Sequence, residues 1–573
     1  MSELAGVGQD PAGEGSRQRV LRVPFGTLRH PHSRGTPAPV RLETAPVTSP
    51  NADMTMPARL LAFAMALATP LAAQQQPPGF DGYVKRVMET FTVPGMAVAI
   101  VKDGKVVLAR GYGVRRLGSP ASVDGSTRFG IASNTKLFTA TALAILVEEG
   151  KVAWDRPVID YLPAFAMADP YVTRELTVRD LLVHRSGLGL GAGDLLWWPP
   201  STYDRKEILR RIRHIPLATS FRSAYAYDNV LYLVAGEVIE AVSGETWEEF
   251  VRTRILARVG MTDSDVLHSG AGESGNVAGT HAAVNDTVRP IAPFLSDNTN
   301  PAGGIMSGAN DMAKWMLVQL DSGRTATGGR LFSPASTAEL WREVTPMPIE
   351  PAPAGLPHLR PVFSGYALGL DVRDYRGRFL LQHTGGLPGY LSKVAMIPEL
   401  RLGVAVLTNQ ESGAAFNSIA YRVLDHYLGA KPRDYPAVYA AIQRRNAEEL
   451  RAAAASAAGA RDSTSGPSLP PARYAGTYRD AWYGDVVLAA EGGGLTIRFS
   501  RSPSLVGDLL HWQHDTFIVR WRDRELRADA YATFTLDPVG RVAALRLVPA
   551  SPTVDFSFDF QDLDLRPVAD SAH

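Results

Sequence analysis

The 573-residue sequence contains no cysteine. This absence excludes disulfide bonds, thiolate metal sites, a cysteine nucleophile and a lipid-modified N-terminal cysteine. The sequence also has no excess of either charge, since 59 Lys and Arg residues stand against 58 Asp and Glu residues. We therefore expect no nucleic-acid partner, because nucleic-acid-binding domains usually carry a basic excess. The motifs Gly-x-Ser-x-Gly and His-Glu-x-x-His are absent as well, which argues against an α/β-hydrolase and a zincin-type metalloprotease.

Long hydrophobic runs are also scarce. The most prominent run, residues 60–73, follows Met54 and Met56 and a single arginine, and it ends in small residues. This order is typical of a secretory signal peptide, and the run is short for a membrane span. We predict a signal peptide over residues 54–73, after a disordered extension over residues 1–53 that an upstream start codon has added. The mature protein is then periplasmic or secreted. The alternative is that the apolar run over residues 60–73 forms a buried helix or an uncleaved membrane anchor.

Residues 78–430 mix helical and strand patterns. Strands at both ends of this region, with helices between them, predict an α+β fold in which distant segments close one mixed sheet. Strands are predicted over residues 96–101, 105–110, 378–381, 391–397 and 403–407, and helices over residues 133–149, 229–241 and from residue 308 onward.

The last third of the chain has a different composition. Residues 431–471 predict a helix rich in Ala, Arg and Glu, followed by a flexible linker rich in Ser, Gly and Pro. Residues 472–567 contain short strand patterns separated by glycine turns, which predicts a small antiparallel barrel or sandwich. Within that region the segment Asp555–Phe560 alternates strictly between polar and apolar residues, as a half-buried strand does.

The first chemical motif is Ser133-Asn-Thr-Lys136. A spacing of three residues at a helix start places both side chains on one face of the helix. A serine hydroxyl is a weak nucleophile until a neighbour takes its proton, and a lysine with a lowered pKa can do so. The motif therefore indicates an activated serine.

Two further motifs supply complementary groups. In Tyr227-Asp-Asn229 the tyrosine can exchange a proton with Ser133, and the amide of Asn229 can contact Lys136 and a substrate amide. In His383-Thr384-Gly385-Gly386 the glycines let a substrate approach a strand closely. There the backbone N–H groups of Ser133 and Gly386 can form an oxyanion hole, and His383 can donate to a substrate oxygen.

Together, in this order and at wide spacing, the three motifs resemble those of the serine β-lactamase and penicillin-binding-protein superfamily, specifically the class C β-lactamase-related hydrolases. The segments Gly104–Gly113, Leu176–Leu188 and Ala302–Ser307 are also similar to that family. The resemblance implies a β-lactamase/transpeptidase-like fold over residues 78–430, a mixed antiparallel sheet flanked by helices. Residues 472–567 resemble the lipocalin-like domains appended to some members.

The resemblance also implies roles. Ser133 is the acylated nucleophile, Lys136 and Tyr227 share the proton transfers, and Asn229, His383, Thr384, Gly385 and Gly386 bind substrate. His383 departs from the lysine that β-lactamases usually carry, and histidine is mostly neutral at pH 7. This difference favours the esterases and D-amino-acid peptidases of the family.

These observations predict an exported serine hydrolase that acts on small esters, peptides or D-amino-acid amides. The alternatives are a β-lactamase or D-Ala-D-Ala carboxypeptidase, and a non-catalytic cell-wall ligand-binding or sensor protein. We expect no cofactor and no metal site, although His511 and His514 lie close together in the sequence. The expected partner is a small-molecule or peptide substrate, and the oligomeric state stays open.

Overall fold

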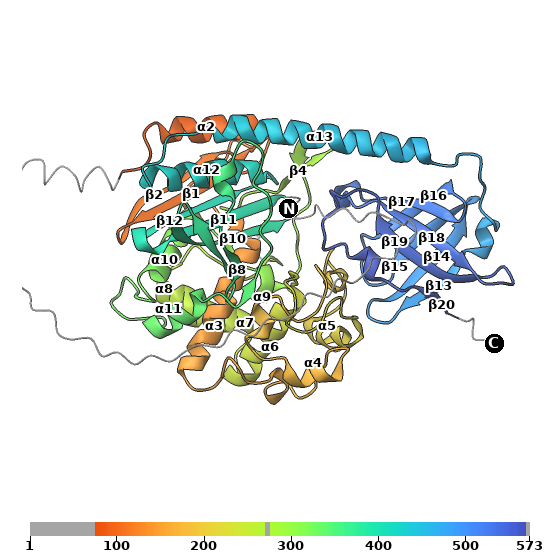
Figure 1. Ribbon diagram of the computed structural model, residues 1–573, viewed down its shortest axis with the longest axis horizontal. Coiled ribbons are helices and arrows are strands. Elements are labelled where there is room, and N and C mark those ends of the chain that lie inside the picture. Colours follow the sequence, from red (N-terminus) through yellow and green to blue (C-terminus); the bar gives the residue numbers. More distant parts are fainter. Residues whose placement is uncertain (1–74, 270–274, 569–573) are drawn as a thin grey trace, which may run out of the picture. The chain divides into compact units, whose positions relative to one another are not determined.

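The computed structural model describes residues 75–269 and 275–568. The predicted extension over residues 1–53 and the predicted signal peptide over residues 54–73 lie outside these residues. Two regions follow, which we call the helix–sheet domain (α2 to α12) and the barrel domain (β13 to β20) (Figure 1). None of the helices among the described residues is both long and apolar enough to cross a membrane.

One eight-stranded sheet organises the helix–sheet domain. Its strands, in the order in which they pair, are β2 (Lys105–Gly113), β1 (Gly95–Lys102), β12 (Leu402–Thr408), β11 (Tyr390–Ile397), β10 (Arg378–Leu387), β9 (Asp371–Tyr375), β8 (Ser364–Tyr366) and β7 (Thr345–Pro346). Every pairing is antiparallel, so the expected mixed sheet is antiparallel throughout. In β1 and β12, Met96 lies opposite Thr408, which confirms that distant segments close the sheet.

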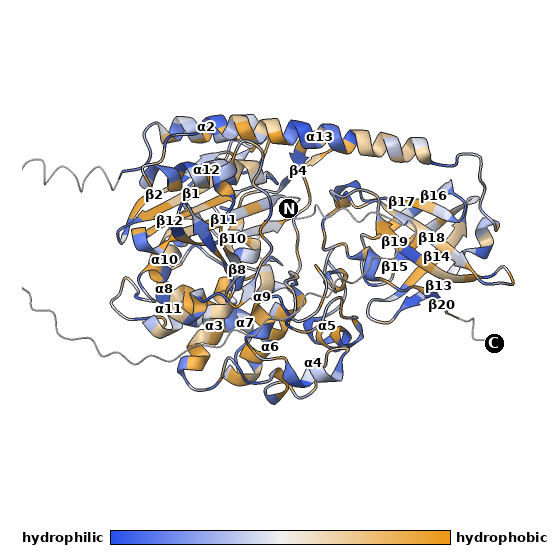
Figure 2. Cartoon of the chain, in the orientation of Figure 1, coloured by the Kyte–Doolittle hydropathy of each residue, from blue (hydrophilic) through white to orange (hydrophobic). Residues whose placement is uncertain are grey.

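Both faces of the sheet are covered by helices. Alternate residues of β1 enter two different cores, Ala97 and Ala99 on one side and Val98 and Ile100 on the other, and all four are fully buried. Figure 2 shows the strands around β1 and β12 as mainly hydrophobic. The first core contains α3 (Lys136–Glu148) and α10 (Ala309–Leu320), and the second contains α2 (Phe80–Phe91) and α12 (Gly413–Tyr427).

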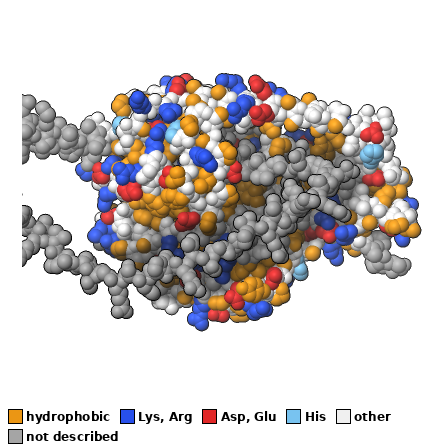
Figure 3. Space-filling view, viewed as in Figure 1, with side chains coloured by type: hydrophobic (Ala, Val, Ile, Leu, Met, Phe, Trp, Pro, Cys, Tyr) orange, Lys and Arg blue, Asp and Glu red, His pale blue; other side chains and the backbone are white. Residues whose placement is uncertain are grey.

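The other helices of this domain are α4 (Pro170–Glu175), α5 (Arg205–Arg211), α6 (Val230–Ser243), α7 (Trp247–Val251), α8 (Ala257–Val259), α9 (Asn300–Gly303) and α11 (Pro334–Trp341). Of these, α6, α7, α9 and α11 contact α3. Two short ladders pair β3 (Phe129–Gly130) with β6 (Met306–Ser307) and β4 (His281–Val284) with β5 (Thr287–Pro290). Charged side chains of both signs are interspersed over the visible face (Figure 3), in keeping with the balanced composition.

The barrel domain follows the long helix α13 (Tyr435–Ala460). Its eight antiparallel strands are β13 (Gly476–Asp480), β14 (Gly484–Glu491), β15 (Gly494–Phe499), β16 (Val506–Gln513), β17 (Thr516–Trp521), β18 (Ala530–Leu536), β19 (Val542–Pro549) and β20 (Arg566–Pro567). An isolated bridge between Leu545 and Leu565 nearly closes the cylinder. The predicted antiparallel barrel is confirmed.

One strand prediction in this domain is wrong. Residues 555–559 form turns rather than a strand, and a single helical turn, Phe560–Asp562, follows them. The alternating residues serve separate contacts: Phe558 and Phe560 pack in the core, while the carboxylate of Asp559 accepts backbone N–H groups of the helix–sheet domain. Alternation here reflects two-sided burial of a loop, which a periodicity of two does not distinguish from a strand.

Candidate active site

Ser133 lies in a tight turn, Ala132–Thr135, that leads directly into α3. The preceding residue, Ala132, has a φ of 50°, in the left-handed region that non-glycine residues seldom adopt. Such strain persists where the surrounding structure enforces it and is concentrated at functional sites. The turn leaves Ser133 half-buried at the N-terminal end of the helix.

Lys136 is the buried partner of this serine. Its Nζ lies 3.1 Å from Oγ of Ser133, 2.7 Å from Oδ1 of Asn229 and 3.1 Å from the carbonyl oxygen of Ala302. The side chain is fully buried, and burial lowers the pKa of Lys136 to about 7. A neutral amine has two N–H groups and one lone pair. Asn229 and Ala302 accept the two N–H groups, so the lone pair remains for the proton of Ser133.

Tyr227 contacts the same serine oxygen from another direction. Its hydroxyl donates to Oγ of Ser133 at 2.8 Å. Burial raises the pKa of Tyr227 above its ordinary value. The phenol therefore keeps its proton at neutral pH, and of these two groups only Lys136 has a pKa near neutrality. Near neutral pH Lys136 is therefore the one of the two that can accept a proton, and Tyr227 donates a hydrogen bond to Ser133.

Strand β10 lies against the turn Ala132–Thr135. A side chain at Gly385 has no room there, because a Cβ atom would lie 2.6 Å from Oγ of Ser392 and 3.0 Å from the backbone nitrogen of Ser133. Thr384, the preceding residue, is exposed, and Gly386 pairs with Leu391 of β11. The glycine of the third motif therefore permits the close approach of strand and serine that an oxyanion hole requires.

His383 is placed differently from the expectation. Its Nε2 lies 2.8 Å from the hydroxyl of Tyr366, and its Nδ1 lies 2.6 Å from the carbonyl oxygen of Thr384. Both ring nitrogens thus have protein partners, so the ring as placed offers no free N–H to a substrate. Burial, together with the charge of Lys136, lowers the pKa of His383 to about 3, so the imidazole is neutral near pH 7.

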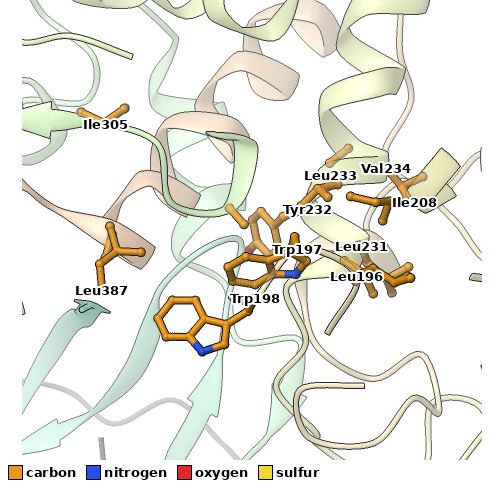
Figure 4. Close-up of a cluster of buried hydrophobic side chains, with 14 of the residues drawn as sticks. Leu196, Trp197, Trp198, Ile208, Leu231, Tyr232, Leu233, Val234, Ile305 and Leu387 are labelled. Atoms are coloured by element: carbon orange, nitrogen blue, oxygen red, sulfur yellow. The ribbon is translucent and has the colours of Figure 1, made fainter. Parts of the chain in front are cut away.

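The tryptophan pair Trp197-Trp198 and the histidines His511 and His514 lie in structural positions. Trp197 and Trp198 are 5% and 6% exposed and belong to the core. Trp197 lies beside Tyr232 of α6 (Figure 4), and Trp198 stacks with Phe294. Nε2 of His511 contacts the carbonyl oxygen of His514. Among the described residues there is no cluster of three or more His, Cys, Asp or Glu side chains suited to a metal ion.

Asp194 also belongs to the site, although none of the sequence motifs contains it. Its fully buried carboxylate accepts Nδ2 of Asn229 at 2.8 Å, the hydroxyl of Ser557 at 2.8 Å and Nε1 of Trp197 at 3.1 Å. Burial raises the pKa of Asp194, and the hydrogen bonds from Asn229 and Ser557 and the charge of Lys136 oppose this shift. An aspartate directly before four large apolar residues was the available signal, since a carboxylate buried there needs donors.

Residues of the barrel domain also reach this site. Asp559 accepts the backbone N–H groups of Gly193 and Leu195, at 2.7 and 3.0 Å. The ring of Phe556 lies edge-on to Tyr227, with the centroids 6.0 Å apart. The segment wrongly predicted as a strand therefore forms part of the surroundings of Ser133.

The chain is similar to known proteins over most of its length. Residues 80–428 match the family model described as Beta-lactamase, and residues 460–567 match one described as a domain of unknown function, DUF3471. The unguisins hydrolase ungD of Aspergillus violaceofuscus is 27% identical over 497 residues, which cover 80% of this chain and 86% of that protein.

Solved structures show the same fold. The octameric penicillin-binding protein homologue from Pyrococcus abyssi gives a TM-score of 0.53 at 22% identity, over 85% of this chain and 98% of that one. The D-amino acid amidase from Ochrobactrum anthropi gives a TM-score of 0.50 at 22% identity, over 61% of this chain and 99% of that one. Since the Beta-lactamase model matches more than half of the sequence, the chain belongs to the beta-lactamase family of hydrolases.

Proposed function

We propose that this chain is a serine hydrolase that forms an acyl-enzyme on Ser133 and transfers the acyl group to water. The observation that carries the proposal is the amine of Lys136, whose two N–H groups are taken by Asn229 and Ala302 while the third position faces Ser133. A base held in this way needs no rearrangement before it accepts a proton.

The reaction proceeds in two balanced halves. Oγ of Ser133 bonds to the substrate carbonyl carbon as its proton passes to Lys136, and the backbone N–H groups of Ser133 and Gly386 hold the oxyanion. The bond to the leaving group then breaks, and that group takes the proton from Lys136 with the hydroxyl of Tyr227 as relay. Water next attacks the acyl carbon and gives a proton to Lys136. The bond between that carbon and Oγ then breaks, Oγ takes the proton back from Lys136, and the carboxylic acid leaves.

The substrate class follows from His383. A neutral imidazole held by Tyr366 and Thr384 supplies no positive charge for a substrate carboxylate. We therefore propose small esters, peptides or D-amino-acid amides as substrates. The relationship to an unguisins hydrolase and the fold shared with a D-amino acid amidase support this choice.

The proposal extends to the barrel and to the destination of the protein. The eight antiparallel strands of the barrel support a lipocalin-like domain. Export to the periplasm or medium is proposed on the signal-peptide pattern of residues 54–73 alone. N-terminal sequencing of the exported protein tests it: a start near Gln74 supports export, and an intact Met1 contradicts it.

A fluorophosphonate probe tests the serine chemistry. We expect the wild type to be labelled and to hydrolyse p-nitrophenyl acetate and a D-alanine p-nitroanilide, and Ser133→Ala to do neither. Absence of labelling would favour the non-catalytic ligand-binding alternative. Intact-mass spectrometry after mixing with a cephalosporin separates the remaining case: an adduct on Ser133 or hydrolysed drug would instead indicate a β-lactamase or D-Ala-D-Ala carboxypeptidase.

A further inference from the structure

We propose that the barrel domain orients the catalytic base through a relay of hydrogen bonds that runs from Ser557 to Asp194, then to Asn229 and Lys136. The relay rests on the proposed function, in which Lys136 takes the proton of Ser133. Ser557 and Asp194 contact neither Ser133 nor the reacting atoms in this arrangement. They are positioning residues, and they act on the reaction only through Asn229.

The amide of Asn229 must face in one direction for the relay to work. It has a donor end and an acceptor end, whereas an ionised carboxylate only accepts. With Asp194 accepting Nδ2, Oδ1 is left to accept from Lys136 at 2.7 Å. A reversed amide would set two acceptors together at Asp194 and two donors together at Lys136, so both of these buried hydrogen bonds would be lost.

Asp194 in turn depends on the barrel domain. Among the described residues no arginine or lysine forms an ion pair with this carboxylate, and its hydrogen bonds come from three uncharged groups. Two of these, Trp197 and Asn229, belong to the helix–sheet domain, and the third is Ser557. A buried carboxylate that loses one of three donors is less stable as an anion. A neutral Asp194 no longer dictates the orientation of Asn229.

Ser557 is held in place by contacts on both sides of it. Two residues later, Asp559 fixes the backbone of Gly193 and Leu195, the residues on either side of Asp194. One residue earlier, Phe556 packs against Gly191 so closely that a Cβ atom there would lie 2.7 Å from its ring. The segment that contains Ser557 and the loop that carries Asp194 are therefore fixed to each other. Ser557 is 4% exposed where they meet.

The charge around Lys136 sets the expected direction of a pH effect. The titratable groups that face it are Asp194, His184, Tyr227 and Asp228 from loops, Tyr232 from α6 and His383 from β10. The two aspartates favour the ammonium form. If Asp194 becomes neutral and Asn229 turns, the ammonium loses both an anion and an acceptor, so Lys136 releases its proton at lower pH.

The experiment compares Ser557→Ala with Ser557→Thr, which keeps a hydroxyl. The matched control is Ser551→Ala, since the hydroxyl of Ser551 contacts Thr553 and not Asp194. Asp194→Asn keeps the side-chain volume but places an amide N–H against the donors that Asp194 accepts, so we expect it to have a larger effect than Ser557→Ala. Each full-length variant is studied by ester hydrolysis as a function of pH. A 13Cε-lysine NMR titration, with the signal assigned by Lys136→Arg, reports Lys136 without any turnover.

In Ser557→Ala we expect kcat to fall about tenfold with KM within twofold, and the Lys136 midpoint to move about 0.5 pH units lower. Ser557→Thr should restore most of the wild-type kcat and Lys136 midpoint. Asp194→Asn should lower kcat and the midpoint more than Ser557→Ala does, and Ser551→Ala should match the wild type. An unchanged kcat and midpoint in Ser557→Ala, or equal losses in the Ala and Thr variants, would overturn the relay. A wild type without serine reactivity would overturn the proposed function instead, while the NMR titration would still test the relay.

Discussion

The hydroxyl of Tyr366 lies 2.8 Å from Nε2 of His383, so the imidazole of the third motif is held by the protein itself. Because both ring nitrogens have protein partners, His383 offers no free N–H to a substrate, contrary to the expectation from the sequence. Its neutral state also removes a like charge from the neighbourhood of Lys136, whose charge contributes to the lowered pKa of His383. The site can therefore hold a lysine base without a second cation beside it.

His383→Lys should destabilise the protein, and more so at low pH. A lysine introduced here would be buried near Lys136, and burial disfavours its ammonium form. Such a group has a folded-state pKa below its unfolded value, so stability is lost as pH falls towards that folded value. We expect a loss of about 1–3 kcal/mol at pH 6 and a smaller one at pH 9 by urea unfolding. His383→Gln, which keeps an acceptor for Tyr366, is the control; equal losses at both pH values would contradict the prediction.

Ester hydrolysis should rise with pH through about 7. Lys136 is a base only when neutral, and burial lowers its pKa to about 7, so activity is lost as pH falls below that value. His383, with a pKa of about 3, should leave no step between pH 5 and 9. The measurement is kcat/KM for a neutral ester from pH 5 to 9, and an acid limb centred near pH 4 would point to a carboxylate base instead.

Lys136→Met should impair acylation more than Tyr227→Phe. The first removes the base, a loss of about 10²–10⁴ in rate. The second removes one hydrogen bond to the attacking oxygen, worth about 1.5–3 kcal/mol or roughly tenfold to a hundredfold. Stopped-flow measurement of the acylation burst with an activated ester compares them. The reverse order of the two losses would assign the base to Tyr227.

Gly385→Ala should abolish activity and lower the melting temperature. The added Cβ would meet Ser392 and the backbone nitrogen of Ser133, so β10 and the turn Ala132–Thr135 would have to separate. Gly82→Ala is the matched control, because Gly82 lies within α2 and has no atom within 4 Å of an added Cβ. That control should keep activity and gain about 0.5–1 kcal/mol in unfolding free energy. A fully active Gly385→Ala would show that the approach is looser than described.

A chain that ends at Leu428 should be poorly soluble and inactive. The hydrophobic core of the helix–sheet domain, which includes Trp197 and Trp198, is continuous with that of the barrel domain. Truncation would also leave the backbone N–H groups of Gly193 and Leu195 without Asp559. Soluble yield, circular dichroism and ester hydrolysis measure the outcome. A soluble truncated chain with normal kcat would show that the barrel only borders the site.

Local patterns predicted much of the fold because each is decided within a few residues. The hairpin at Asp103-Gly104 joins β1 and β2 with Lys102 opposite Lys105, and both turn residues have positive φ, as that sequence favours. The helix predicted over residues 133–149 is α3, which begins at Lys136 after a single tight turn that contains Ser133. Periodicity and turn chemistry suffice for such elements.

The missed features depend on contacts between residues far apart in the sequence. Nothing near His383 indicates that Tyr366 occupies its Nε2, and nothing near Asp194 indicates a donor at Ser557. The segment Asp555–Phe560 has the pattern of a strand and lacks only a pairing partner, which no local rule supplies. Single motifs thus indicated the residues that the structure brings together at Ser133, whereas the contacts that orient them required the tertiary structure.

The pairing of β1 with β12 also has a consequence for the order of events during synthesis. Met96 of β1 can pair with Thr408 of β12 only after Thr408 has been synthesised. The sheet therefore cannot form completely until nearly all of the helix–sheet domain has been made. Contacts so distant in sequence fold slowly, because the entropy of closing the loop is lost before the strands gain their hydrogen bonds. Ser133 is translated early in this interval. A ribosome-bound chain therefore carries Ser133 for most of its elongation without β10, the strand that lies against it in the folded protein.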